Sequence, residues 1–178
     1  MAYDLKDTFY LTTSLSTGTS ANDQAAALDL SSYVDPIARR GSKAQGLAIY
    51  RVSMSFRQGS GVVDKAEDGS TKVGLIAGSG LIAGTISIQD NTILTPSNDL
   101  CIAAYDYYGP ATADSALNGF NVTPTKEVPY VVVRDNLNLI CSTDDAFAAA
   151  VDIDVRLECA VVTLDQATLN QLLRTQTV

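Results

Sequence analysis

The clearest pattern along the chain is a strict alternation of apolar and polar residues between Val151 and Val162. Its apolar positions are Val151, Ile153, Val155, Leu157, Cys159 and Val161, and the positions between them are Asp152, Asp154, Arg156, Glu158 and Ala160. Successive side chains of a β-strand point to opposite faces, so the pattern predicts a strand with one buried face and one solvent-exposed face. At about 3.3 Å per residue the strand would span roughly 40 Å, a length that suits sandwiches and barrels.

Two further segments alternate in the same way. Between Gly46 and Arg57 the pattern predicts a second strand with one apolar and one polar face. Its apolar face is predicted to hold Ala48, Tyr50, Val52, Met54 and Phe56, and its polar face Arg51, Ser53, Ser55 and Arg57. The stretch from Phe9 to Leu15 carries a weaker version of the alternation. One wet face on each strand favours an antiparallel sheet.

Shorter apolar segments raise the total to about eight strands. Gly74 to Gly84 repeats the residues Leu-Ile-Ala-Gly around a Ser-Gly pair, which predicts two short strands that meet at a glycine turn. Leu100 to Tyr107 is rich in the apolar and aromatic residues that strands favour. Pro129 to Arg134 and Leu137 to Cys141 flank Asp135-Asn136, a dipeptide that predicts a tight hairpin turn.

Turn-rich segments between these strands predict loops at Thr17–Asn22, Gln58–Ser70 and Tyr108–Pro124. The whole pattern predicts one all-β domain over residues 1–178, a single antiparallel β-sandwich of about eight strands with a short C-terminal helix. The composition agrees with this, because 46% hydrophobic and 18% charged residues are enough to form a core and exclude a disordered chain.

The C-terminal residues predict the helix. Thr163 and Gln166 have the spacing of a capping box. Its apolar stripe consists of Leu169, Leu172 and Leu173. A helix of about ten residues is marginal alone, so it must pack on its own domain or on a neighbour. Its small apolar surface predicts that deletion of Asp165–Val178 would impair assembly more than folding.

The charge balance narrows the range of partners. Twelve basic and twenty acidic residues leave a net charge of −8, so the molecule repels polyanions on average and direct binding to nucleic acid is not expected. Arg39, Arg40 and Lys43 form the one basic cluster in the sequence. These residues are candidates for an interface with an acidic neighbouring surface, although simple exposure to solvent explains them as well.

Cysteine usage and hydropathy restrict the setting of the protein. Cys101, Cys141 and Cys159 lie in apolar runs, and their spacing matches neither a zinc-ligand pair nor a redox motif. They are predicted to be buried free thiols, which favours assembly in a reducing cell interior. The N-terminal residues lack the apolar core of a signal peptide, and the sequence has no apolar run of about 18 residues, so no transmembrane segment is expected.

The absence of histidine excludes the catalytic triads and the metal sites that depend on it. No nucleotide-binding loop or nucleophile elbow stands in a suitable context, so the protein is predicted not to be an enzyme and to carry neither a cofactor nor a metal. The remaining carboxylate clusters are Asp64, Glu67 and Asp68 in a loop, and Asp152, Asp154 and Glu158 on one strand face. Solvation explains both, and a cation shared between subunits is the alternative for the second cluster.

Tyr105, Tyr107 and Tyr108 end one of the predicted strands. Tyrosine rings offer flat apolar faces with polar tips, so this cluster suits either a sugar platform or a protein interface.

A sandwich of about eight strands with long loops and a short C-terminal helix resembles the single jelly-roll major capsid proteins of icosahedral viruses. The resemblance implies two facing sheets, subunits grouped in capsomers, and termini that tie neighbours together, for which residues 1–19 (an N-terminal arm or edge strand) and 165–178 (a helical tail) are the candidates. The residues proposed for subunit contacts are Arg39, Arg40, Lys43, Tyr105, Tyr107, Tyr108, Leu169, Leu172 and Leu173.

The resemblance also implies a place and partners. The protein would assemble in the host cytoplasm into the virion, in contact with copies of itself and with other capsid proteins. One departure is that the N-terminus carries Asp4, Asp7 and a single Lys6 instead of a basic arm, which would leave genome contact to another protein or to an internal membrane. A β-sandwich module that binds carbohydrate or a receptor is the main alternative, and an enzyme with paired carboxylates is the third hypothesis.

Overall fold

The chain forms nine strands and one helix over the residues that the computed structural model describes, which are 8–37, 43–59, 69–78, 94–109 and 117–176. The strands are β1 (Thr8–Ser16), β2 (Asp23–Asp29), β3 (Ala44–Arg57), β4 (Gly69–Ala77), β5 (Cys101–Gly109), β6 (Leu117–Val122), β7 (Tyr130–Val132), β8 (Asn136–Asp145) and β9 (Asp152–Leu164), and the helix is α1 (Gln166–Thr175).

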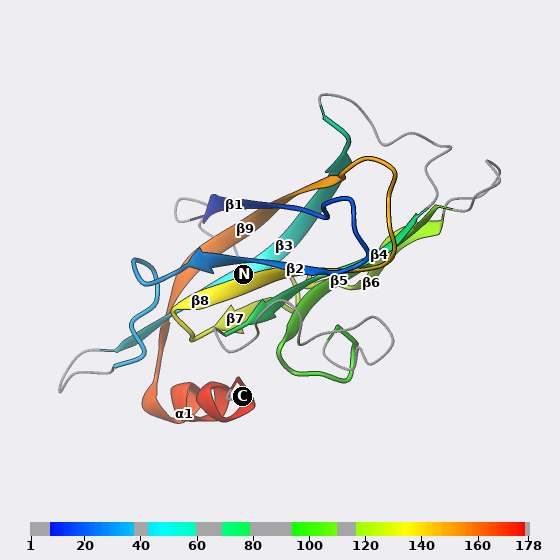
Figure 1. The fold of residues 1–178 in the computed structure, drawn as a ribbon. Coiled ribbons are helices and arrows are strands. Elements are labelled where there is room, and N and C mark those ends of the chain that lie inside the picture. The colour runs from blue at the N-terminus through cyan, green and yellow to red at the C-terminus, as the bar shows by residue number, and fades with distance from the viewer. Residues whose placement is uncertain (1–7, 38–42, 60–68, 79–93, 110–116, 177–178) are drawn as a thin grey trace.

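The strands form two sheets that enclose the main core between them (Figure 1). The first sheet has the order β1-β9-β3-β7, and the second has the order β2-β8-β4-β5-β6. Every pair of neighbouring strands is antiparallel. The prediction of an antiparallel all-β sandwich with a short C-terminal helix is therefore confirmed.

Strand β9 crosses the middle of the first sheet, and its apolar face forms much of the core. The side chains of Ile153, Leu157 and Cys159 are fully buried between the sheets, as the alternation predicts. Val161 is the exception, because it is 38% exposed near the end of the strand. The pairing of β9 with β1 stops at Ala160, one residue before Val161.

A β-bulge in β3 corrects the predicted face of this strand. The register against β9 shifts between Ile49 and Arg51, so Tyr50 is the extra residue. Leu47 and Ile49 face the core before the bulge, and Val52, Met54 and Phe56 face it afterwards. The assignment of Ala48 and Tyr50 to this apolar face was wrong, because one inserted residue reverses the side to which every later side chain points.

The predicted hairpin at Asp135-Asn136 was also wrong. Strand β7 pairs with β3 in the first sheet, whereas β8 pairs with β2 and β4 in the second. The dipeptide therefore lies where the chain crosses from one sheet to the other, and the Asp135 carbonyl accepts a hydrogen bond from the Leu30 N–H at 2.7 Å. A turn-forming dipeptide indicates a change of direction, but it does not specify which strands pair.

The sequence pattern did not predict two of the strands, and part of one predicted hairpin lies outside the described residues. Strand β2 has a run of alanines in place of clear alternation, and β6 lies inside the predicted loop Tyr108–Pro124. The first half of the Leu-Ile-Ala-Gly repeat is the end of β4, while its second half lies in 79–93, outside the described residues.

The predicted C-terminal helix is present, but its cap differs from the prediction. Asp165 is the N-cap, and its carboxylate accepts a hydrogen bond from the Thr168 N–H at 2.7 Å, whereas Thr163 belongs to β9. This hydrogen bond lowers the pKa of Asp165. The helix packs on the outer side of the first sheet, where Leu169 is buried against Ala44, Val133 and Leu164. No helix in the described part of the chain has the length and apolar character needed to cross a bilayer.

Candidate subunit interface

The first sheet presents a polar surface on the side turned away from the core. This surface, here called the polar face, consists of Tyr10, Thr12, Ser14 and Ser16 of β1, Asp152, Asp154, Arg156 and Glu158 of β9, and Arg51, Ser53, Ser55 and Arg57 of β3. The register places charged residues in the central row and mostly short hydroxyl residues in the flanking rows. A shallow groove crosses the face and is lined by Thr12, Ser14, Ser53, Ser55, Asp154 and Arg156.

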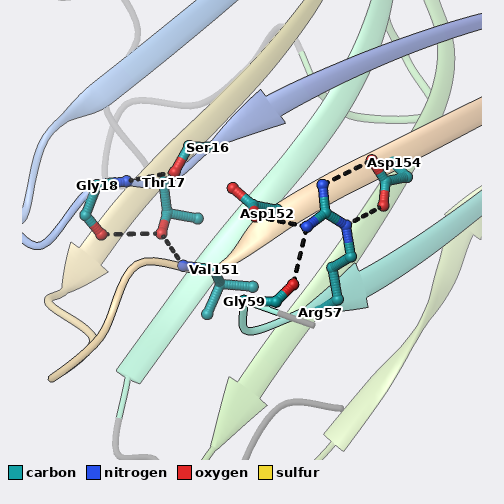
Figure 2. Close-up of polar contacts among 8 residues, drawn as sticks. All are labelled: Ser16, Thr17, Gly18, Arg57, Gly59, Val151, Asp152 and Asp154. Atoms are coloured by element: carbon teal, nitrogen blue, oxygen red, sulfur yellow. Dashed lines mark hydrogen bonds and ion pairs between the residues drawn. The ribbon is translucent and has the colours of Figure 1, made fainter. Parts of the chain in front are cut away.

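The three carboxylates on the polar face are paired within the subunit, two of them with Arg57 (Figure 2). Arg57 Nε lies 2.6 Å from Asp154 Oδ2, and Arg57 Nη1 lies 2.8 Å from Asp152 Oδ2. The hydrogen bond to Asp154 and the charges of both carboxylates raise the pKa of Arg57. Glu158 pairs in turn with Lys126 at 3.2 Å. Because these groups are partly exposed, the pairs contribute little net stability, but they hold these side chains in one arrangement on the surface.

The idea of a cation between subunits gains no support from this arrangement. Asp152 and Asp154 both face the guanidinium of Arg57, and Glu158 faces an ammonium group. In the part of the chain that the structure describes, no three carboxylate, thiol or imidazole groups lie where they could hold a metal ion.

A buried threonine fastens β1 to β9 at one end of the polar face. The Thr17 N–H donates to the Val151 carbonyl at 2.9 Å. Thr17 Oγ1 accepts from the Val151 N–H at 3.1 Å and donates to the Gly18 carbonyl at 3.0 Å (Figure 2). Gly18 has a φ of 70°, a left-handed conformation that glycine adopts without steric cost. These bonds fix the register of β1 and hold the strand in place.

Tyr10 is the most exposed aromatic side chain on this surface. It is 62% exposed, and the Arg156 guanidinium lies 5.1 Å from the centre of its ring. Tyrosine and arginine are enriched in protein interfaces, where the ring supplies contact area at a low entropic cost. Tyr10 was not among the predicted contact residues, although its position on the polar side of an alternating strand was a usable signal.

The predicted tyrosine cluster does not form one platform. Tyr105 and Tyr107 point into the sandwich, where both rings contact Phe56 at centroid distances of 5.0 and 5.6 Å. Burial raises the pKa of Tyr105. Tyr108 points to the opposite side of β5 and is 52% exposed, because successive strand residues alternate between faces.

The other predicted contact residues fall into three groups. Arg39 and Arg40 lie outside the described residues. Lys43 is exposed next to the start of β3, and its charge helps, after the Thr168 hydrogen bonds, to lower the pKa of Asp165. The leucines of α1 pack against the first sheet of their own subunit. Leu169 is 1% exposed, and Leu172 and Leu173 pack around the same cluster.

Gln176, the residue after α1, binds the outer edge of the first sheet. The sequence pattern did not predict this contact. Gln176 Oε1 accepts from the Val133 N–H at 3.1 Å, and Gln176 Nε2 donates to the Val131 carbonyl at 2.6 Å. The side-chain amide thus pairs with β7 as a neighbouring strand would. Together with the burial of Leu169, this makes the predicted tail 165–178 part of the fold as far as residue 176, so its deletion is now expected to impair folding as well.

The three cysteines are free and buried, as predicted. Burial raises the pKa of Cys101 and Cys141 to about 11 and that of Cys159 to about 12. A raised pKa means that the folded state holds the thiol proton more tightly, so these groups favour folding below about pH 8.5 and this contribution is lost as the pH rises toward about 11.

We expect the native protein at pH 8 to react with Ellman's reagent more than a hundredfold more slowly than the unfolded chain. A thiol with a pKa of about 11 is only about 0.1% thiolate at that pH, against about a quarter for an unperturbed thiol. The control is the same reaction in guanidinium chloride, which should titrate three thiols per chain. Rapid labelling of any thiol in the native protein would contradict the burial.

Comparison with protein-family models and with curated proteins finds no match for this sequence.

Proposed function

We propose that the protein is a self-assembling structural subunit built on a jelly roll, of the kind that forms viral capsid shells. The order of strand pairing carries this proposal. With β6 set aside, the first strand pairs with the last (β1 with β9), the second with the next to last (β2 with β8), the third with the one before that (β3 with β7), and β4 with β5. Such nesting arises when a long hairpin of four strand pairs rolls into two sheets, which is the arrangement of a jelly roll.

Jelly rolls occur in capsid proteins and in lectins, so the surface has to favour one class over the other. The polar face favours assembly, because its three carboxylates are paired within the subunit and its uncharged side chains are mostly short hydroxyl residues. Such a surface can lie against a neighbour without leaving a carboxylate unpaired. Carbohydrate binding has less support, since Tyr108 alone of the three tyrosines is exposed on its face.

The proposed partners are copies of this chain, together with other capsid proteins in a virion assembled in the host cytoplasm. The net charge of −8 supports contact with protein surfaces in preference to the phosphates of a genome.

Purified full-length protein tests the proposal through size-exclusion chromatography with light scattering and electron microscopy, over a range of concentration and salt. We expect regular oligomers or closed particles whose fraction rises with protein concentration. A strictly monomeric species under all conditions would count against the proposal. Binding in a glycan screen that Tyr108→Ala abolishes, in a protein that stays monomeric, would support the carbohydrate module instead.

A further inference from the structure

Strand β1 has a neighbour on one side only among the described residues. It pairs with β9 along its entire length and ends the order of the first sheet. The Thr17 N–H donates to the Val151 carbonyl, one residue beyond the last pair of the β1–β9 register, so the N–H groups of odd-numbered residues point toward β9. Because the direction of N–H groups alternates along a strand, those of the even-numbered β1 residues point away from β9. These residues are Thr8, Tyr10, Thr12, Ser14 and Ser16.

This edge lacks the devices that usually prevent strands from pairing between molecules. Its nine residues include no charge, proline or glycine, and Thr17 holds it in register with β9. The other edges differ. Strand β7 has three residues, and Gln176 binds its free side. Strand β6 contains Gly119 and pairs with β5 through a bulge. Strand β2 begins and ends with an aspartate.

We infer that β1 pairs with β1 of a second copy of this chain, antiparallel and about a two-fold axis at Thr12. The inference rests on the proposed function and names one of its contacts. In this register Thr12 lies opposite Thr12, Tyr10 opposite Ser14, and Thr8 opposite Ser16, all of them residues whose backbone groups are turned outward. The two first sheets then join into one continuous sheet of eight strands.

The side chains on β1 agree with this register. Phe9 and Leu15, which pack at the margin of the core, come to lie opposite each other, so both apolar faces remain on the inner side of the joined sheet. Threonine pairs across strands are favourable. The equivalent pairing of two β2 strands over their full length would place Asp23 opposite Asp29 twice, and like charges directly opposite one another are destabilising. The repulsion between these aspartates disfavours pairing of β2 with itself, whereas the uncharged strand β1 can pair with its own copy.

Thr12→Cys tests the register directly. Residues opposite each other in a hydrogen-bonded antiparallel pair have Cα atoms about 5.5 Å apart, within the range that a disulfide spans. We expect mild oxidation to convert most of the Thr12→Cys protein into covalent dimer. Ser16→Cys is the matched control on the same face of the same strand, because two copies of residue 16 would lie about 27 Å apart. The buried native thiols give little background.

Thr12→Pro is the second variant. Its missing N–H points away from β9, so the strand should keep its place in the sheet while losing a central hydrogen bond to the partner. We expect the dimer to dissociate at least tenfold more readily, with thermal unfolding of the monomer nearly unchanged. Equal cross-linking of the Thr12 and Ser16 variants, together with unchanged dimerisation of Thr12→Pro, would overturn the inference.

The outcomes also separate this inference from the proposed function. Regular particles in the microscope without Thr12 cross-links would refute the β1 pairing and leave the shell proposal intact. Thr12-linked dimers that never form larger assemblies would support the pairing and refute the shell. Cross-links that form only when Thr12→Cys is mixed with Ala25→Cys would overturn the two-fold contact in favour of a head-to-tail pairing of β1 with β2.

Discussion

Replacing Leu157 with alanine is expected to lower the free energy of unfolding by about 2–5 kcal/mol. Leu157 lies in the middle of β9, opposite Leu11 on one side and Val52 on the other, and its side chain is 0% exposed. The change removes buried apolar surface and leaves a cavity between the two sheets. The hydrogen bonds within each sheet keep the strands in place, so the sheets cannot move together to fill the cavity. Because a domain of this size has roughly 5–15 kcal/mol of stability, a large part of it would be lost.

Urea unfolding of Leu157→Ala and of a control variant measures the change in the free energy of unfolding. Low protein concentration is needed, since association would raise the apparent stability. Val161→Ala is the matched control on the same face of the same strand. It is 38% exposed, so its cost should stay below about 1 kcal/mol. Similar losses in both variants would show that β9 does not cross the core as described.

Gly74→Ala is expected to destabilise the protein by about 1–3 kcal/mol through overpacking. A Cβ atom on Gly74 would lie 1.9 Å from Leu94 Cδ2 and 2.7 Å from Leu94 Cδ1, far inside van der Waals contact. Leu94 is 0% exposed and packs with Ile76 and Ile140 on the outer side of the second sheet, so its side chain has little room to move. The methyl group can fit only if the Leu94 side chain moves within its packed surroundings or the backbone shifts.

A double-mutant cycle with Leu94→Ala isolates this contact. Once the leucine is shortened, adding alanine at Gly74 should cost much less than it does in the natural protein. Gly119→Ala on β6 is the control, because nothing lies within 4 Å of its Cβ position and the change should stay within about 1 kcal/mol. An equal cost of Gly74→Ala with and without Leu94 would contradict the packing.

The two long strands of the first sheet differ in how far their residue pattern predicts the buried face. The alternation in β9 predicts its buried face correctly over Ile153 to Cys159. The same reasoning assigned Ala48 and Tyr50 to the wrong face of β3, because a bulge cannot be read from periodicity. A bulge adjusts one strand to the twist of its neighbours, so it depends on residues that are distant in the sequence.

The candidate interface was predictable only in part. The polar row of β9 was recognised from its charges, but its pairing with Arg57, about a hundred residues away along the chain, was not. Leu169 was proposed for contacts between subunits and is instead buried within its own subunit. A helical stripe shows that a face must be covered, and it does not show what covers it.

By itself the sequence determined the local elements. The alternating residues of β1, β3 and β9 and the leucine stripe of α1 specify their type of structure, because side-chain direction depends on backbone geometry over a few residues. The tertiary structure decided which strands are neighbours: the nested pairs, the separation of β7 from β8, and the closure of the β7 edge by Gln176. Those contacts join residues far apart along the chain, so local periodicity carries no record of them. That order also places β1 at the end of the first sheet, with one neighbouring strand among the described residues.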